Sequence, residues 1–142
     1  MDLKEITNSS VDTVILQTVI HHLEGKTFKD TQKNVTRGIE ECMRILKPGG
    51  KLLIVESVVF PWFEMVERML YSFMQLFFKV IHFDTVYQYS YRSLLKKIKV
   101  MNLCVEESSM VEVDKYIWLC RKKIPSKITP CRACWIMIRK AK

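Results

Sequence analysis

ECMRILKPGGKLLIVES, from Glu41 to Ser57, carries the end of a helix, a turn and a strand in direct succession. Apolar residues recur at three-to-four-residue spacing from about Asp30 to Leu46, which predicts an amphipathic helix. Pro48-Gly49-Gly50 is expected to end this helix, because glycine accepts the left-handed conformation of a cap and proline cannot continue the helix. Lys51 to Ser57 is a continuous apolar run, as found in strands of buried parallel sheets.

An equally apolar run lies upstream of this helix. Val11 to Val19, read VDTVILQTV, predicts a second strand that is covered on both faces of a sheet. Strand, helix and strand with short links form a βαβ unit, in which the two strands run parallel. The sequence therefore predicts an α/β fold.

The segment from Phe60 to Phe83 is rich in aromatic residues and methionine at helical spacing, and predicts a long helix. Its charged residues argue against a membrane-spanning segment, which needs about 20 mostly uncharged residues. A core helix of the domain is the favoured interpretation. A helix that lies flat on a membrane is the alternative.

The last part of the chain predicts one more helix and two more strands. The helix covers about Ser90 to Met101, and Asn102 follows where a left-handed cap is expected. The strands are Leu103 to Met110 and Ala133 to Arg139. The segment between them, Glu112 to Pro130, is basic and is expected to be irregular.

The composition fits one globular domain. The chain has 142 residues, of which 49% are hydrophobic and 27% charged, and this balance excludes a disordered chain. Its net charge of +8 predicts either a solvated basic surface or attraction to an anionic partner. The cysteines number five, and the N-terminus carries no apolar targeting segment, so we expect reduced thiols and a cytoplasmic location.

Four stretches, in their order along the chain, resemble strands four to seven of class I S-adenosylmethionine-dependent methyltransferases of the type 11 kind. They are SVDTVILQTVIHHL (Ser10 to Leu23), ECMRILKPGGKLLIVES, YSYRSLLKKIKVMNLCVEES (Tyr89 to Ser108) and ITPCRACWIMIRK. The resemblance implies a partial Rossmann-like sheet with flanking helices and an antiparallel last strand. It also implies one truncated domain over residues 1–142, in which residues 60–89 form a lid-like helical insertion.

The same resemblance implies an incomplete site for the cofactor, S-adenosylmethionine. The family's glycine-rich loop follows its first strand, but the four glycines here (Gly25, Gly38, Gly49 and Gly50) form no G-x-G pattern. We therefore expect this chain alone to bind S-adenosylmethionine weakly or not at all. The strand from Val11 to Leu16 would leave an open apolar edge, where we expect a protein partner or a second copy.

Open α/β sheets bind ligands at the carboxyl ends of their strands. The resemblance implies that Gln17 and Thr18 line the methionine end of the cofactor, and that Asp2 matches a position that contacts adenine. Ordinary strand-end packing is an equally weighted interpretation of Gln17 and Thr18.

Three residues at the same ends of the strands are the catalytic candidates: His21, His22 and Glu56. A histidine here could act as a base, because imidazole titrates near neutral pH. Glu56 could orient a methyl acceptor. The favoured alternatives are structural: a histidine that caps the next helix and a glutamate that caps a turn.

Two further groups have alternative interpretations. Tyr87, Tyr89 and Tyr91 either line an acceptor pocket or are half-buried surface aromatics. Cys131 and Cys134 form a C-x-x-C pair, but a structural zinc site usually needs four ligands, so no metal is expected.

The leading functional interpretation is a methyltransferase, or a fragment of one, that acts on a small acceptor of unknown identity. The alternative is a non-catalytic interaction protein that has the methyltransferase sheet and has lost cofactor binding. Nucleic-acid binding is disfavoured, because the basic run Arg121 to Lys127 shows no RNA-binding motif with interleaved aromatic residues.

Overall fold

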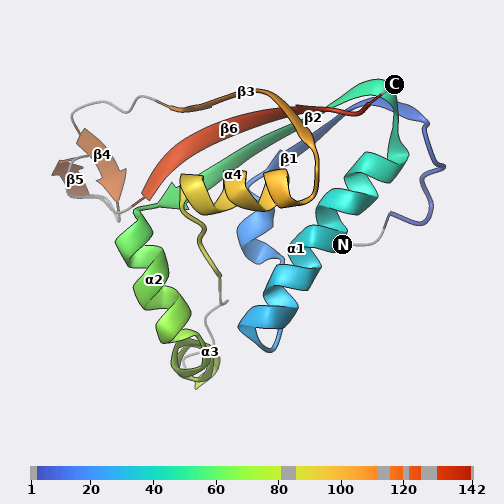
Figure 1. Ribbon diagram of the computed structural model, residues 1–142. Coiled ribbons are helices and arrows are strands. Elements are labelled where there is room, and N and C mark those ends of the chain that lie inside the picture. The colour runs from blue at the N-terminus through green and yellow to red at the C-terminus, as the bar shows by residue number, and fades with distance from the viewer. Residues whose placement is uncertain (1–2, 81–85, 112–115, 120–121, 126–130, 142) are drawn as a thin grey trace.

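The computed structural model describes residues 3–80, 86–111, 116–119, 122–125 and 131–141 (Figure 1). Its main sheet has four strands in the order β1-β2-β6-β3. Their bounds are β1 Val11–Gln17, β2 Leu46–Val59, β3 Cys104–Met110 and β6 Cys131–Arg139. Strand β1 runs parallel to β2, and β6 runs antiparallel to both β2 and β3. These pairings confirm the parallel βαβ unit, the antiparallel last strand and the Rossmann-like sheet.

Helices α1 (Phe28–Ile45) and α4 (Tyr91–Val100) lie on the same side of the sheet (Figure 1). Their apolar stripes pack on the alternate strand residues that face them, and the buried core lies between. From the helices come Val35, Ile39, Cys42, Leu94 and Ile98, and from the strands come Leu16, Leu52, Ile54, Val58, Cys134, Ile136 and Ile138. Asn102 has a φ of 56° directly after α4, which confirms the predicted left-handed cap.

The opposite face of the sheet is covered less well by the described residues. Ile15 of β1 is 60% exposed, and its sheet neighbour Leu53 is only partly buried. The expectation that the first strand is covered on both faces is therefore wrong for the part of the chain that the structure describes. Strand β1 is also the terminal strand of the sheet, so its outer edge pairs with no described strand.

The turn Pro48-Gly49-Gly50 belongs to the start of β2. Helix α1 ends at Ile45, and the strand begins at once at Leu46, five residues earlier than Lys51 where it was expected. The β1–β2 register shifts between Val11 and Thr13, and this irregularity accommodates the additional residues at the start of β2. The Gly49 N–H donates to the Lys140 carbonyl at 3.1 Å, which adds this segment to the sheet.

The predicted long helix from Phe60 to Phe83 is two helices in the described residues, α2 (Pro61–Met69) and α3 (Tyr71–Val80). They meet at Leu70, whose φ and ψ are −95° and 8°. The core-helix interpretation is wrong for α2, because none of its residues is buried. Among the side chains of α3 that the structure describes, Tyr71 alone is buried.

The basic segment that was expected to be irregular contains two short strands. They are β4 (Tyr116–Leu119) and β5 (Lys122–Pro125), which pair antiparallel as a separate sheet. Across the described ranges no helix is long and apolar enough to cross a membrane.

Candidate functional site

The carboxyl ends of β1 and β2 lie side by side. Gln17 is in register with Val55, and the Thr18 N–H donates to the Val55 carbonyl at 2.9 Å. Thr18 then adopts a φ of 51°, and this left-handed residue turns the chain out of the sheet. The next element is η1, a single 3-10 turn over Ile20–His22. This turn therefore places the two histidines near the carboxyl end of β2.

Glu56 of β2 is buried and accepts three hydrogen bonds. Its Oε2 accepts from the Ile20 N–H at 2.8 Å, and its Oε1 accepts from the Ser57 N–H at 2.9 Å. The Nδ1 of His21 lies 2.6 Å from the same Oε1. An ionised carboxylate only accepts hydrogen bonds, so a neutral ring that faces it carries its proton on Nδ1 and its lone pair on Nε2. The structural and the chemical interpretations of Glu56 are therefore compatible, because one carboxylate caps the turn and holds the ring.

The structure brings together some of the predicted residues and separates others. The side chain of His21 is 14% exposed, so its ring is largely enclosed beside Glu56. The exposed His22 has its ring centroid 4.2 Å from that of His21. Gln17 and Thr18 are exposed at the same edge of the sheet. Asp2 lies outside the described residues.

Tyr87 and Tyr89 are core residues, 1% and 3% exposed, so the expectation of half-buried surface aromatics is wrong for them. Their ring centroids lie 4.8 Å apart, and Tyr87 also packs edge-on against Phe28. Burial raises the pKa of both phenols. The Tyr87 N–H donates to the His21 carbonyl at 3.2 Å, so this aromatic cluster is hydrogen-bonded to the turn that carries the histidines.

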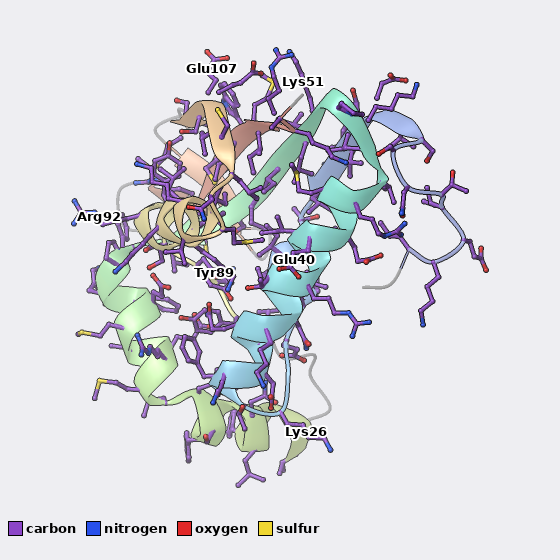
Figure 2. The ribbon with its side chains drawn as sticks, turned by 45° about the vertical axis from the view of Figure 1, so that its right-hand side comes forward. Lys26, Glu40, Lys51, Tyr89, Arg92 and Glu107 are labelled. Carbon is purple, nitrogen blue, oxygen red and sulfur yellow. The ribbon has the colours of Figure 1, made fainter. Side chains whose placement is uncertain are left out.

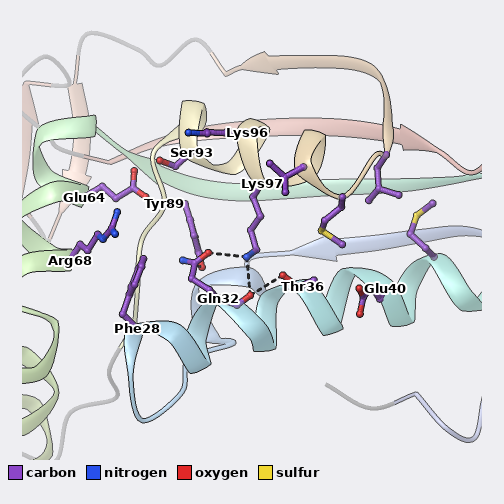
Figure 3. Close-up of a pocket in the computed structure, with 14 residues that line it drawn as sticks. Phe28, Gln32, Thr36, Glu40, Glu64, Arg68, Tyr89, Ser93, Lys96 and Lys97 are labelled. Carbon is purple, nitrogen blue, oxygen red and sulfur yellow. Dashed lines mark hydrogen bonds between the residues drawn. The ribbon is translucent and has the colours of Figure 1, made fainter.

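A groove of about 790 Å³ lies between α1 and α4 (Figure 3). Lys97 of α4 crosses it, and its Nζ donates to the carbonyl and to the side-chain oxygen of Gln32, both at 2.8 Å. Gln32 in turn donates to the Tyr89 hydroxyl at 3.0 Å. Burial lowers the pKa of Lys97. Sequence reasoning missed this groove, because only the packing of two helices on one face of the sheet creates it.

The C-x-x-C pair does not form a metal centre in the described structure. Cys131 and Cys134 are three positions apart in β6, and residues at odd spacing in a strand point to opposite faces. Burial raises the pKa of Cys134 to about 11. No group of three or more histidine, cysteine or carboxylate side chains among the described residues is placed to hold a metal ion.

Comparison with known proteins finds similarity to methyltransferases. Residues 1–54 match a family model described as a methyltransferase domain. No curated protein matches the chain.

Several solved structures share the fold. An S-adenosylmethionine-dependent methyltransferase from Methanosarcina mazei aligns with a TM-score of 0.55 and 16% identity, over 96% of this chain and 62% of that one. A chain in the complex between the Haloferax volcanii Trm112 methyltransferase activator and a methyltransferase aligns at 0.58 and 15%, over 99% and 58%. A geranyl diphosphate methyltransferase in complex with GPP and sinefungin aligns at 0.54 and 12%, over 96% and 48%.

The present chain therefore spans between about half and two thirds of the length of these three structures. At such identities the alignments establish the fold and leave the activity open. Residues 1–54 thus match a methyltransferase domain, and the chain shares the fold of S-adenosylmethionine-dependent methyltransferases.

Proposed function

We propose that this chain is the C-terminal part of a methyltransferase that transfers a methyl group from S-adenosylmethionine to a small acceptor. The observation that carries the proposal is the His21–Glu56 pair, 2.6 Å apart, at the carboxyl ends of two parallel strands. Open α/β sheets bind their ligands at this edge. Residues 1–142 would then be one truncated domain that forms one wall of the site.

The cofactor would lie against Gln17 and Thr18. Their exposed polar side chains and the turn at Thr18 fit the polar methionine end of S-adenosylmethionine. Bound S-adenosylmethionine would supply a methyl group activated on its sulfonium. The chain's contribution is mainly to align the acceptor with that methyl group, which can lower the barrier by roughly 7–11 kcal/mol.

His21 is the proposed base. Its Nδ1 donates to Glu56, so Nε2 keeps the lone pair that can take a proton from an acceptor hydroxyl. The acceptor oxygen would bond to the methyl carbon as the bond from that carbon to the sulfonium sulfur breaks. The demethylated product would then leave, and the acceptor proton would move to Nε2 of His21. Glu56 is a positioning residue, because it fixes the ring and stabilises the imidazolium that results. His22 stands beside this ring and is assigned no proton transfer.

Residues 60–89 are proposed as a lid-like insertion beside the acceptor. The segment after α3 touches the histidine turn, since Tyr87 donates to His21. One structural relative is named a geranyl diphosphate methyltransferase, and we therefore propose an acceptor with an apolar part. Four described cysteines are free thiols, which fits the cytoplasmic location that we propose.

Calorimetric titration with S-adenosylmethionine and with its demethylated product tests this proposal. Because this chain forms only one wall of the site, we expect weak binding, with a Kd above roughly 100 µM, about −5.5 kcal/mol. Thr18→Arg should weaken binding at least about tenfold, since a long side chain would fill the edge of the site. Ile15→Ser, at an exposed position of the same strand, should leave the Kd unchanged. An equal affinity of the wild type and of Thr18→Arg would contradict the proposed site.

An interaction protein without catalysis is the second candidate. It is favoured by the unpaired outer edge of β1 among the described strands and by the exposed Ile15. One structural relative was solved in a complex with an activator protein, and a protein partner is proposed for this chain as well. Sedimentation velocity separates the two candidates. A dimer that Ile15→Lys dissociates, in a sample that binds no cofactor, supports the interaction protein.

A further inference from the structure

Helices α2 and α3 present their apolar side chains to solvent (Figure 2). Met69 is 78% exposed and Phe73 64% exposed. The other large exposed side chains of the two helices are Trp62, Met65, Val66, Leu70, Leu76, Phe77 and Val80. Single exposed apolar residues are ordinary, but such a group on two consecutive helices indicates a binding surface.

The polar side chains of α2 face the protein. Glu64 accepts from the Ser90 N–H at 3.0 Å and from the Tyr87 hydroxyl at 3.2 Å. Glu67 accepts from the Gln88 N–H at 3.3 Å. A helix that packs on a core by its apolar stripe shows the reverse arrangement. Helix α2 is therefore held to the domain by its carboxylates and leaves its apolar side uncovered.

Helix α3 is attached in the same way. The Tyr71 hydroxyl is buried and donates to the Gly25 carbonyl at 2.9 Å. Gln75, one turn later, donates to a carboxylate oxygen of Glu24 at 3.2 Å. Phe73 and Phe77 stack with each other on the exposed side, with ring centroids 6.5 Å apart. Among the side chains that the structure describes, both helices thus turn hydrogen-bonding groups inward and most of their large apolar groups outward.

Charge around this surface is positive. The only acidic residues in α2 and α3 are Glu64 and Glu67, and both are bonded inward. Figure 2 shows Lys26 beside α3 and Arg92 beside the start of α2, and both are exposed. The net charge of the chain is +8. A surface with outward apolar groups, a basic rim and no outward carboxylate complements an anionic lipid bilayer.

We propose that the outer side of α2 and α3 docks in the interface of an anionic membrane. The helices have nine and ten residues, too few to span a bilayer, so they would lie in the plane of the interface. Trp62, at the start of α2, has the amphipathic ring that is enriched at the level of lipid headgroups. This inference does not depend on cofactor binding.

Vesicle flotation of the full chain tests the docking. We expect binding to phosphatidylcholine vesicles with about a quarter phosphatidylserine, weaker binding to phosphatidylcholine alone, and a loss with added salt. The double variant Met69→Ser, Phe73→Ser should lower the partition coefficient at least about tenfold, about 1.4 kcal/mol. Met110→Ser is the control, because it removes an exposed apolar side chain from β3 of the sheet, and it should change nothing.

Brominated lipids give a second readout. They should quench the fluorescence of Trp62, and Trp62→Phe should keep vesicle binding while it removes most of the quenching. Far-UV circular dichroism confirms that each variant is folded. Absence of vesicle binding by the folded wild type overturns the proposal. So does a lipid-free oligomer that the double variant dissociates, since the apolar side then belongs to a protein interface.

Discussion

Replacement of Glu56 by alanine should destabilise the fold strongly, because this one carboxylate serves two backbone donors. Glu56 is 2% exposed, and it accepts from the N–H groups of Ile20 and Ser57 as well as from His21. A buried donor left without a partner costs about 1–3 kcal/mol. With two such donors, Glu56→Ala should lower the free energy of unfolding by about 2–6 kcal/mol.

Urea denaturation followed by circular dichroism measures this loss, provided that the slope m stays unchanged. Glu56→Gln keeps the shape and one acceptor oxygen, so its loss should be smaller, about 1–3 kcal/mol. Glu107→Ala, at an exposed carboxylate of β3, is the control and should stay within about 0.5 kcal/mol of wild type. If Glu56→Ala also stays within that range, Glu56 does not hold the turn that carries His21.

Three further perturbations test other parts of the fold. Gly50→Ala should cost about 1–3 kcal/mol in urea denaturation, because a Cβ there would lie 2.9 Å from the Lys47 carbonyl oxygen; an unchanged midpoint would refute this packing. Burial raises the pKa of Glu67 from an ordinary value of 4.5 to about 7, so its protonated form is favoured by the folded state. The favourable contribution of the protonated Glu67 is complete below the unfolded pKa and is lost as pH rises through the folded one. Solvent screens this partly exposed carboxyl, so stability relative to Glu67→Gln should fall by about 1–2 kcal/mol between about pH 4.5 and pH 8; parallel curves for the two proteins would contradict it. Burial raises the pKa of Cys42 to about 11, so mass spectrometry after iodoacetamide treatment should find the exposed Cys104 alkylated well before Cys42, and equal rates would count against the buried position.

Much of the sheet could be predicted from the sequence, because its strands are continuous apolar runs. The parallel pairing of Val11–Gln17 with the later strand, the helix between them and the cap at Asn102 all follow from local patterns. The two strands in the basic segment could not be predicted, because their residues lack a clear apolar alternation. The start of β2 at Leu46 was also missed, since glycine and proline in a bulge resemble a turn.

The candidate site was predicted only as a set of residues at one edge. His21 and Glu56 are separated by 35 positions, and their contact depends on the register of β1 against β2 and on the left-handed turn at Thr18. Residue types do not encode either feature directly. The orientation of α2 was likewise invisible in the sequence, since the spacing of apolar residues defines a stripe and does not define which side it faces.

The location of the cofactor site is tested most directly by amide chemical shifts of the ¹⁵N-labelled chain during titration with the demethylated product of S-adenosylmethionine. We expect the shifts to concentrate on Gln17, Thr18, His21 and Ser57, at the carboxyl ends of β1 and β2. Shifts centred on Gln32 and Lys97 in the groove between α1 and α4, or shifts spread evenly over the chain, would contradict the proposed methyltransferase site.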